Sequence, residues 1–477
     1  MYTVAQLIGG VWGAGGEAGD LVVHDPATGT PVTGAPVATA DEVGKAVAAA
    51  RGVAAEWAAT PPADRAAALH RAADAVAAAA DELAEATTAE MGKPLADARG
   101  GVEAGIATLR QYAELATARG GRTLHGGPDA LDFMTPQPRG VVAVLTPWND
   151  PVAVSCGLLG AALVTGNVVL HKPSERTPAT GWLLARAFDS ALPVGVLSLL
   201  TGGAETGAAL AGAEVDVVAH VGSTLTGRAV AAAAARSGAK VLLENGGSDP
   251  LIVDADVDPV WAAGQAATGA FANAGQICVA VERVYAHRDV AEDFVAALVE
   301  RAAALRVGPG GDPATDLGPL VDRRHRDQVH GQVTAAVADG ARIRIGGTLP
   351  EGPGAFYPAT VLDNCRHDMA LVREETFGPV APVVVVDSFS EALRCAADSP
   401  YGLAATVLTG SMSHAQRAWR ELPVGTVKVN AVFGGAPAGA AHPRRGSGQG
   451  FGYGPELLDE FTATKAVHIE APGGGHW

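Results

Sequence analysis

The fold is decided by five short apolar runs between residues 141 and 244, which read VVAVL (141–145), NVVLHK (167–172), VLSLL (196–200), VVAHV (217–221) and KVLLE (240–244). Each run is almost continuously aliphatic, as expected for a strand that helices cover on both faces. Helical stretches separate the runs. Five such units in about 100 residues predict a parallel, doubly wound sheet with right-handed crossovers.

On either side of this stretch the pattern changes. From Thr39 to about Thr117 it is helical, with a capping box at Thr39 and Glu42 and breaks at Pro61-Pro62 and from Gly92 to Pro94. The second half of the chain alternates less regularly, which predicts a second α/β unit. Its apolar runs lie near 281–286, 380–386, 403–408 and 426–430.

The composition is that of an ordered, acidic protein. Of its 477 residues, 48% are hydrophobic and 18% are charged, and the formal net charge is -17. Because phosphates need a basic partner surface, this charge argues against nucleic acid, and it argues equally against an anionic membrane surface. A chain of this length is expected to fold as two or three units.

The four cysteines are scattered through the chain, with no C-x-x-C and no His/Cys cluster, so neither a disulfide framework nor a metal site is expected. The first ten residues, MYTVAQLIGG, lack the basic start and the long apolar run of a signal peptide. Both features favour the cytoplasm, where a lone thiol stays reduced. The cysteines are Cys156, Cys278, Cys365 and Cys395.

A nucleotide is expected at a sheet of this kind, but the usual fingerprints are missing. The sequence has no complete G-x-G-x-x-G, no Walker A motif and no G-x-S-x-G elbow. One strand-to-helix junction reads HVGST (220–224), with Gly227 one turn further on. A glycine and a hydroxyl that open a helix offer backbone donors to a phosphate, or they form no more than a helix cap.

Three side chains are candidates for chemistry. Cys278 follows Gly275 in FANAGQICVAVER (271–283), and its thiol suits covalent catalysis, although a buried cysteine can also be inert packing. Glu244 ends KVLLE and precedes glycines that let another group approach, or it is a plain loop carboxylate. Asn149 in TPWNDP can donate to an oxyanion or simply form a turn.

Taken in order, these segments resemble the aldehyde dehydrogenase superfamily. Each segment is short, but they are collinear across most of the chain, which is very hard to obtain by chance. The matching segments are TPWNDP (146–151), KPSE (172–175), GSTLTG (222–227), ENGG (244–247), FANAGQIC (271–278), EETFGPV (374–380), YGLAA (401–405) and SGQG (447–450).

The resemblance implies an aldehyde dehydrogenase-like α/β fold in three parts. A Rossmann-like dinucleotide-binding domain would comprise residues 1–121 and 140–245, and an α/β catalytic domain would comprise 246–446. Oligomerisation strands in 122–139 and 447–477 would bridge the subunits of a homodimer or homotetramer. The residues themselves add only that 122–139 and FTATKAVHIE (461–470) look extended.

The resemblance also implies oxidation of an aldehyde to a carboxylic acid. Cys278 matches the nucleophile that carries a thiohemiacetal and then a thioester, Glu244 matches the base that activates the hydrolytic water, and Asn149 matches the oxyanion amide. The cofactor would be NAD(P), with NAD preferred because Glu175 would repel a 2′-phosphate and NADP kept open by Lys172. The matching cofactor residues are Thr146, Pro147, Trp148, Lys172, Ser174, Glu175, Gly222, Ser223, Glu375 and Phe377.

The sequence departs from the family pattern in a few places. Asn245 replaces the usual leucine after the base, Phe451 stands where an arginine is common, and the stretch 433–446 has unusual spacing. Asn245, Phe433 and Phe451 are candidates to shape the aldehyde pocket.

Two other functions stay open at this point. A CoA-acylating relative would transfer the acyl group to CoA, and Glu244 argues against it because that transfer needs no base for water. A catalytically silent scaffold or binding protein on the same fold is the other alternative. The retained nucleophile, base and amide argue against it.

Overall fold

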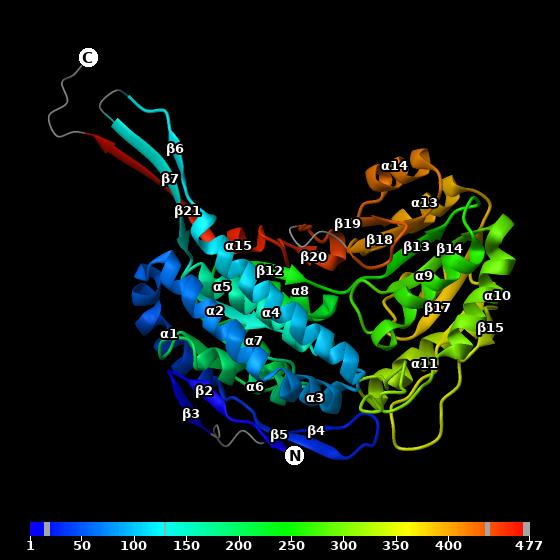
Figure 1. Ribbon diagram of the computed structural model, residues 1–477, viewed down its shortest axis with the longest axis horizontal. Helices are drawn as coiled ribbons and strands as arrows, with labels where there is room; N and C mark the ends of the chain where they lie inside the picture. Colours follow the sequence, from blue (N-terminus) through cyan, green and yellow to red (C-terminus); the bar gives the residue numbers. More distant parts are fainter. Residues whose placement is uncertain (14–19, 128–129, 435–438, 471–477) are drawn as a thin grey trace.

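The structure, a computed structural model, describes residues 1–13, 20–127, 130–434 and 439–470. Within these residues the chain is an α/β protein built on two large sheets, of eight and seven strands, and two small sheets of three strands each (Figure 1). The expected fold class is confirmed.

The eight-stranded sheet contains the five strands that the sequence predicts. Its order is β20-β12-β11-β8-β9-β10-β2-β3, and the five strands from β12 to β10 run parallel. Its antiparallel edges come from the two far ends of the chain. One of them, β20, lies in the stretch expected to bridge subunits, yet it pairs with β12. The strands are β2 (Gln6–Ile8), β3 (Val11–Gly13), β8 (Val141–Leu145), β9 (Val168–Lys172), β10 (Leu197–Leu199), β11 (Val217–Val221), β12 (Lys240–Glu244) and β20 (Gly448–Gln449).

Helices pack against this sheet and bury all five residues of β8. The first helix begins with the expected capping box, because Thr39 Oγ1 accepts the N–H of Glu42 and the Glu42 carboxylate accepts the N–H of Thr39. The expected breaks also occur, and Gly92 ends the third helix in a left-handed conformation at φ 84°. The helices are α1 (Ala40–Ala59), α2 (Pro62–Ala78), α3 (Ala80–Met91), α4 (Leu95–Ala118), α5 (Pro151–Val164), α6 (Pro178–Asp189), α7 (Ala204–Ala211) and α8 (Thr224–Ala234).

The seven-stranded sheet forms the second α/β unit, with its own hydrophobic core. Its order is β15-β16-β17-β14-β13-β18-β19, and only the β15–β16 pair is antiparallel. Four strands coincide with the predicted apolar runs, whereas β13, β15 and β16 are not predicted. The elements are β13 (Asp249–Val253), α9 (Pro259–Phe271), η1 (Ala272–Gly275), β14 (Val281–His287), α10 (Arg288–Ala304), α11 (Arg323–Ala338), β15 (Arg342–Ile345), β16 (Thr360–Asp363), α12 (Ala370–Arg373), β17 (Val380–Val386), α13 (Phe389–Ala397), β18 (Ala404–Leu408), α14 (Met412–Glu421) and β19 (Thr426–Val429).

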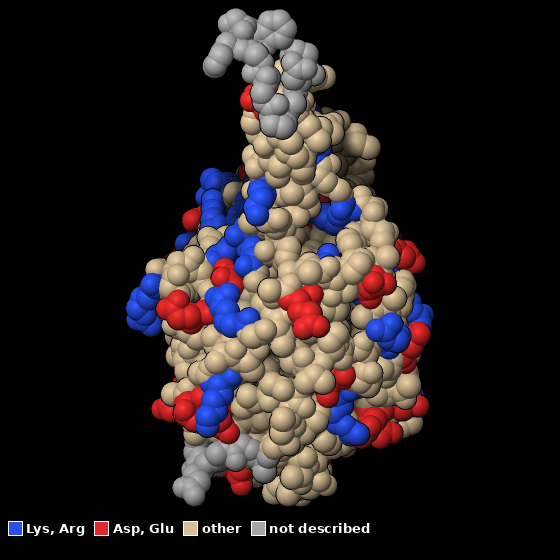
Figure 2. All heavy atoms as spheres, turned by 90° about the vertical axis from the view of Figure 1, so that its left-hand side faces the viewer, with Lys and Arg blue, Asp and Glu red and all other residues tan. Residues whose placement is uncertain are grey.

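One small sheet projects from the body as an arm, made of β6 (Arg122–Leu124), β7 (Ala130–Pro138) and β21 (Thr462–Glu470) (Figure 1). Charges of both signs are interspersed over the face in Figure 2, and most of the arm's described surface there is uncharged. The remaining elements are β1 (Tyr2–Thr3), β4 (Asp20–His24), β5 (Pro31–Pro36), η2 (Arg445–Ser447) and α15 (Leu457–Glu460).

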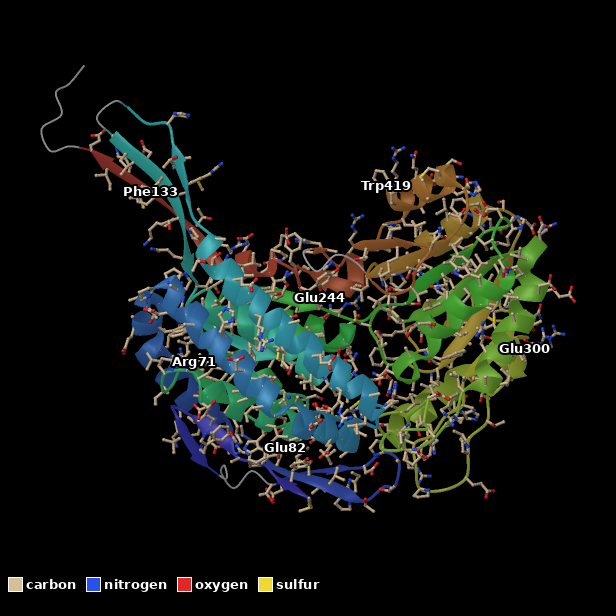
Figure 3. The ribbon with its side chains drawn as sticks, viewed as in Figure 1. Arg71, Glu82, Phe133, Glu244, Glu300 and Trp419 are labelled. Atoms are coloured by element: carbon tan, nitrogen blue, oxygen red, sulfur yellow. The ribbon has the colours of Figure 1, made fainter. Side chains whose placement is uncertain are left out.

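The two large sheets meet near the carboxyl end of β12, where Glu244 lies between the two units in Figure 3. Ligands of open α/β sheets bind outside the carboxyl ends of parallel strands, so this edge is where a site is expected. In the described part of the chain, no helix combines the length and the apolar character needed to cross a membrane.

Candidate active site

Two loops from different sheets meet at this edge. The loop after β8 carries Asn149, and the segment before β14 carries Cys278. Asn149 Nδ2 donates to the carbonyl of Gln276 at 3.0 Å, and Asn273 Nδ2 donates to the carbonyl of Asn149 at 3.3 Å. The fold therefore brings two residues that lie 129 positions apart in the sequence (278 minus 149) into one site.

The turn before Cys278 is left-handed over three consecutive residues. Asn273, Ala274 and Gly275 have φ values of 49°, 55° and 71°, a conformation that costs non-glycine residues roughly 1–3 kcal/mol each. Only glycine fits at position 275, because a Cβ there would collide with the Gly378 carbonyl. Gln276 braces the turn by donating to the Asn273 carbonyl at 3.0 Å and accepting the N–H of Val321 at 2.9 Å.

The thiol of Cys278 is the one free thiol of the four that is not fully buried. Burial, with smaller contributions from the carboxylates of Glu244, Asp249 and Glu375, raises its pKa to about 12. At neutral pH the thiol is therefore protonated, and it needs a nearby group that takes or compensates its proton before it can act as a nucleophile.

Glu244 lies at the end of β12 with its carboxylate turned into the site. Burial raises its pKa to about 8, against a smaller opposing effect from the N–H of Gly452. Its Oε1 is buried and has no hydrogen-bond partner among the described residues. A Cβ at position 452 would collide with this side chain, so Gly452 gives the carboxylate its room. A carboxyl group that titrates near pH 8 suits a general base.

The glycines after Glu244 admit two other groups, as the sequence predicts. A Cβ on Gly246 would collide with the Glu375 carboxylate, and a Cβ on Gly247 would lie 2.6 Å from the carbonyl of Cys278. Glu375 Oε1 accepts the N–H of Gly247 at 2.9 Å. The ENGG segment therefore joins the EETFGPV loop and the Cys278 loop.

A buried carboxylate that the sequence analysis missed holds the EETFGPV loop. Glu282, on β14, accepts the N–H of Thr376 at 3.0 Å and the N–H of Phe377 at 2.8 Å. Phe377 has a left-handed φ of 54°, so these bonds fix a strained backbone. A second missed carboxylate, Asp249, accepts the N–H of Ala404 at 3.0 Å, and burial raises its pKa to about 8. Nothing in the local sequence pattern marks either residue.

Trp148 and Phe377 form an aromatic wall beside this loop, with ring centroids 5.5 Å apart in an edge-to-face arrangement. Arg176 lies over the Trp148 ring at 5.1 Å from its centroid. His325 donates its Nε2–H to the carbonyl of Phe377 at 2.7 Å. Trp148 and Phe377 are predicted site residues, whereas Arg176 and His325 are not.

The KPSE segment follows β9 at the same edge. Lys172 Nζ donates to the carbonyls of Pro173 and Gly202 at 2.8 and 2.9 Å, and burial lowers its pKa. Glu175 Oε2 is 3.9 Å from Lys172 Nζ and its side chain is half exposed. Ser174 Oγ accepts the N–H of Arg176 at 3.2 Å, so Ser174 shapes the turn.

The loop after β8 begins with two buried residues, Thr146 and Pro147. Thr146 Oγ1 hydrogen bonds with His171 Nε2 at 2.9 Å, and the N–H of Thr146 donates to the carbonyl of Lys172 at 3.1 Å. These bonds tie the TPWN loop to the start of the KPSE segment.

The junction between β11 and α8 contains the predicted phosphate loop. Ser223 caps α8, because its Oγ accepts the N–H of Thr226 at 3.2 Å. A Cβ on Gly222 would lie 2.8 Å from the His220 ring, so a glycine is needed there. Burial lowers the pKa of His220 to about 4, which keeps that ring neutral. The helix cap is therefore present, and the first turn of α8 still offers backbone donors.

The residues expected to shape the aldehyde pocket contact other parts of the chain. Asn245 points away from the nucleophile, because its Nδ2 donates to the Gly446 carbonyl at 3.2 Å and its side chain faces Gly227 of α8. Phe451 packs edge-to-face on His442 at 3.9 Å between centroids. Phe433 lies under Lys428 at 5.7 Å. Part of the unusual 433–446 stretch, residues 435–438, is outside the described residues.

Comparison with known proteins identifies the family. The model of the aldehyde dehydrogenase family matches residues 12–467. A 3,6-anhydro-alpha-L-galactose dehydrogenase from Streptomyces coelicolor is 37% identical over 472 residues, which cover 98% of this chain and 96% of that protein. The chain therefore belongs to the aldehyde dehydrogenase family, and the expected resemblance is confirmed.

Two solved structures agree with this assignment over nearly the whole chain. A 3,6-anhydro-L-galactose dehydrogenase in complex with NAP superposes with a TM-score of 0.95 at 33% identity, covering 98% of this chain and 100% of that one. The NAD+ complex of an aldehyde dehydrogenase from Bacillus cereus superposes with a TM-score of 0.95 at 32% identity, covering 98% and 96%.

Proposed function

We propose that Cys278, Glu244 and Asn149 carry out the oxidation of an aldehyde to a carboxylic acid in this member of the family. The observation that carries the proposal is the bond from Asn149 Nδ2 to the Gln276 carbonyl, 3.0 Å long, which fixes the amide next to the Cys278 loop. An amide nitrogen has two N–H donors, so one stays available to a substrate oxygen.

In the first half of the reaction, Cys278 Sγ forms a bond to the aldehyde carbon. The carbonyl oxygen gains negative charge, and the free N–H of Asn149 and the backbone N–H of Cys278 donate to it. The thiol proton needs an acceptor, and Glu244 suits this role because its pKa, about 8, lies close to neutral and it is the carboxylate with the largest electrostatic effect on Cys278. When the oxyanion re-forms its double bond, the carbon loses its hydrogen and a thioester on Cys278 remains.

The predicted cofactor residues fit an NAD(P) molecule. The half-exposed Glu175 carboxylate beside Lys172 can accept both hydroxyls of a ribose, and Gly222, Ser223 and the first turn of α8 offer donors to phosphates. Glu375, whose Oε1 accepts the N–H of Gly247, would supply an acceptor for the hydroxyls of the second ribose. When bound, the nicotinamide accepts the hydride that leaves the aldehyde carbon. NAD is preferred over NADP because the Glu175 carboxylate would repel a 2′-phosphate.

In the second half, Glu244, which has released the thiol proton to solvent, takes a proton from water, and the resulting hydroxide attacks the thioester carbon. The tetrahedral oxygen again lies at Asn149, the C–S bond breaks, and the carboxylic acid leaves while Cys278 recovers its thiol. The open Oε1 of Glu244 supports this role, because a carboxylate oxygen without a partner can still accept a proton. A hydrolytic enzyme needs such a base and a CoA-acylating one does not.

Product analysis tests this proposal directly. The protein is incubated with an aldehyde and NAD, with and without CoA, while absorbance follows the reduced cofactor and chromatography identifies the product. We expect free acid in both reactions, and mass spectrometry of the quenched enzyme should find the acyl group on Cys278. Strict dependence on CoA, or acylation at another cysteine, would contradict the proposal.

We also infer that a second copy of the chain covers the arm. Leu131 and Ile469 are paired across β7 and β21, and they are 53% and 52% exposed. Light scattering should find a dimer or tetramer, and a L131K/I469K double variant should dissociate it. A V194K variant, which changes an exposed valine on the body, is the matched control. An unchanged mass for the double variant would exclude the arm as the interface between subunits.

We also infer that the protein works in a reducing compartment such as the cytoplasm, because such a compartment would keep the Cys278 thiol free.

A further inference from the structure

A charged pair lies beside the proposed oxyanion amide and takes no part in the mechanism above. Asp150 directly follows Asn149, and Lys93 Nζ, from the segment between α3 and α4, lies 3.2 Å from its Oδ1. The lysine side chain is 7% exposed, whereas the aspartate side chain is 41% exposed. The pair therefore has a buried cationic end and an open carboxylate end.

The carboxylate is held in place by its surroundings. Asp150 occupies the N-cap position of α5, yet its side chain makes no capping hydrogen bond, although aspartate is among the best capping residues. It is turned instead toward α4, where a Cβ on Gly101 would lie 2.6 Å from Oδ1. Among the described residues, no donor contacts Oδ2. The chain thus forgoes a helix cap and leaves one carboxylate oxygen free next to Asn149.

We propose that Asp150 accepts a hydrogen bond from a hydroxyl group of the substrate, so that the site selects hydroxylated aldehydes. The proposal rests on the proposed function, because it takes the aldehyde oxygen to be held at Asn149. Consecutive Cα atoms are about 3.8 Å apart, so a substrate group that reaches position 150 lies close to the aldehyde carbon. A hydroxyl on the second or third carbon meets this requirement.

The charge of the pair decides between classes of substrate. Lys93 already neutralises Asp150, so a cationic aldehyde would meet little net negative charge there. An alkyl chain would strip water from the open oxygen and return no hydrogen bond, which is unfavourable for a carboxylate. A hydroxyl replaces that water and keeps the oxygen bonded. Lys93 acts in this scheme as a positioning residue, because it holds Asp150 without touching the substrate.

The test compares two aldehydes of three carbons, glyceraldehyde and propionaldehyde, which differ in their hydroxyls. The measured quantity is the ratio of their kcat/KM values with NAD. We expect the unmodified protein to favour glyceraldehyde, and D150L to lower the ratio by about 10- to 100-fold, the effect of one hydrogen bond to a charged group. The loss should fall mainly on the KM for glyceraldehyde, because the bond exists before and during the reaction.

Three further variants separate recognition from folding. D150N keeps the size and one acceptor oxygen, so its ratio should lie between those of D150L and the unmodified protein, and it serves if D150L does not fold. K93M should lower the ratio less than D150L does. D74N is the matched control, because Asp74 forms an exposed ion pair with Arg110 of α4 at 3.1 Å, and its ratio should equal that of the unmodified protein.

Two outcomes would overturn the inference while leaving the proposed function intact. In the first, D150L and D150N lower kcat/KM equally for both aldehydes, which would make the pair purely structural. In the second, the unmodified protein prefers 3-aminopropionaldehyde to glyceraldehyde, which would make Asp150 a cation site. Failure of the proposed function looks different, since no aldehyde of any class would then be oxidised.

Discussion

Two buried glutamates in this molecule differ in how completely they are hydrogen bonded. Glu90 near the end of α3 accepts the N–H of Ala179 at 2.8 Å and both the N–H and the Oγ1–H of Thr180, at 2.9 and 2.8 Å. Glu244 has one oxygen without a partner among the described residues. Burial raises both pKa values, to about 7 for Glu90 and about 8 for Glu244.

This difference in hydrogen bonding distinguishes a structural carboxylate, Glu90, from the proposed catalytic one, Glu244. Each bond to Glu90 ties α3 to the start of α6, and both of its carboxylate oxygens are occupied. Glu244 keeps an open acceptor at the edge where the two α/β units meet, and an unsatisfied buried group is tolerated where it has a function. Mutations of residues that are fully hydrogen bonded can therefore be compared with mutations of residues that keep a free group.

The largest effect is expected at the thiols. C278A removes the proposed nucleophile and should lower kcat by about 10⁵-fold or more, as removal of a nucleophile does elsewhere. C156A changes a thiol that is fully buried against α4, so it should lower stability and leave kcat near that of the unmodified protein. Absorbance assays and thermal unfolding measure both. Equal activity of the C278A and C156A variants would contradict the assignment of Cys278 as the nucleophile.

The next effect concerns Glu244. E244Q removes the base but keeps the shape, and hydrolysis should fall by about 10²- to 10⁴-fold. The burst of reduced cofactor in the first turnover should slow as well, because Glu244 also accepts the thiol proton of Cys278 in the first half of the reaction. Rapid-mixing absorbance measures the burst. A steady rate equal to that of the unmodified protein would assign the base to another residue.

The raised pKa of Glu244 also predicts the direction in which the rate changes with pH. A general base acts as the carboxylate, and burial raises the pKa of Glu244, the proposed base, to about 8. The hydrolytic rate should therefore increase as pH rises through 8 and level off above it, with a tenfold change per pH unit on the acid side. The E244Q variant should lose this increase of the rate with pH. A rate that falls across the same interval would contradict the assignment.

A smaller effect, on stability rather than rate, is expected at Glu90. E90A leaves three buried donors without an acceptor, and at about 1–3 kcal/mol for each unpaired group the free energy of unfolding should fall by at least about 3 kcal/mol. Urea unfolding measures the change, and kcat of the folded enzyme should stay within about twofold. Lost activity at unchanged stability would place Glu90 in the chemistry.

The smallest effect is expected at Ser223, which caps α8 and lies in the proposed phosphate loop. S223A removes the cap of α8 and should lower stability by about 1 kcal/mol, and S223G should recover most of this loss. Calorimetric titration with NAD should find weaker binding to S223A if the loop holds phosphate. Equal affinity for all three proteins would limit Ser223 to capping.

The sequence predicts the parts of the fold that have long local patterns. The five parallel strands are found because runs such as 141–145 are continuously apolar. β13 escapes because it begins with Asp249 and Pro250, residues that are rare in strands. The edge strands β2, β3 and β20 have only two or three residues each, which is too short for any periodicity.

In the site, the roles come from motifs and the contacts come from the fold. Cys278, Glu244 and Asn149 are named by collinear segments, but the bond that unites Asn149 with Gln276 spans 127 residues. Glu282 bonds Thr376 across 94 residues, and Asn245 turns toward Gly446, 201 residues away. Such partners depend on tertiary packing, which a linear pattern does not contain.

The arm has a consequence for how the protein is made. His468 of β21 bonds Asp132 of β7 across 336 residues, so the arm stays without its third strand until β21 has been synthesised. At about 5–20 residues per second, β7 waits roughly 20–70 s for its neighbour. During this interval the edge of β7 is unpaired and can pair with another chain, and any assembly through the arm waits until synthesis has reached residue 470.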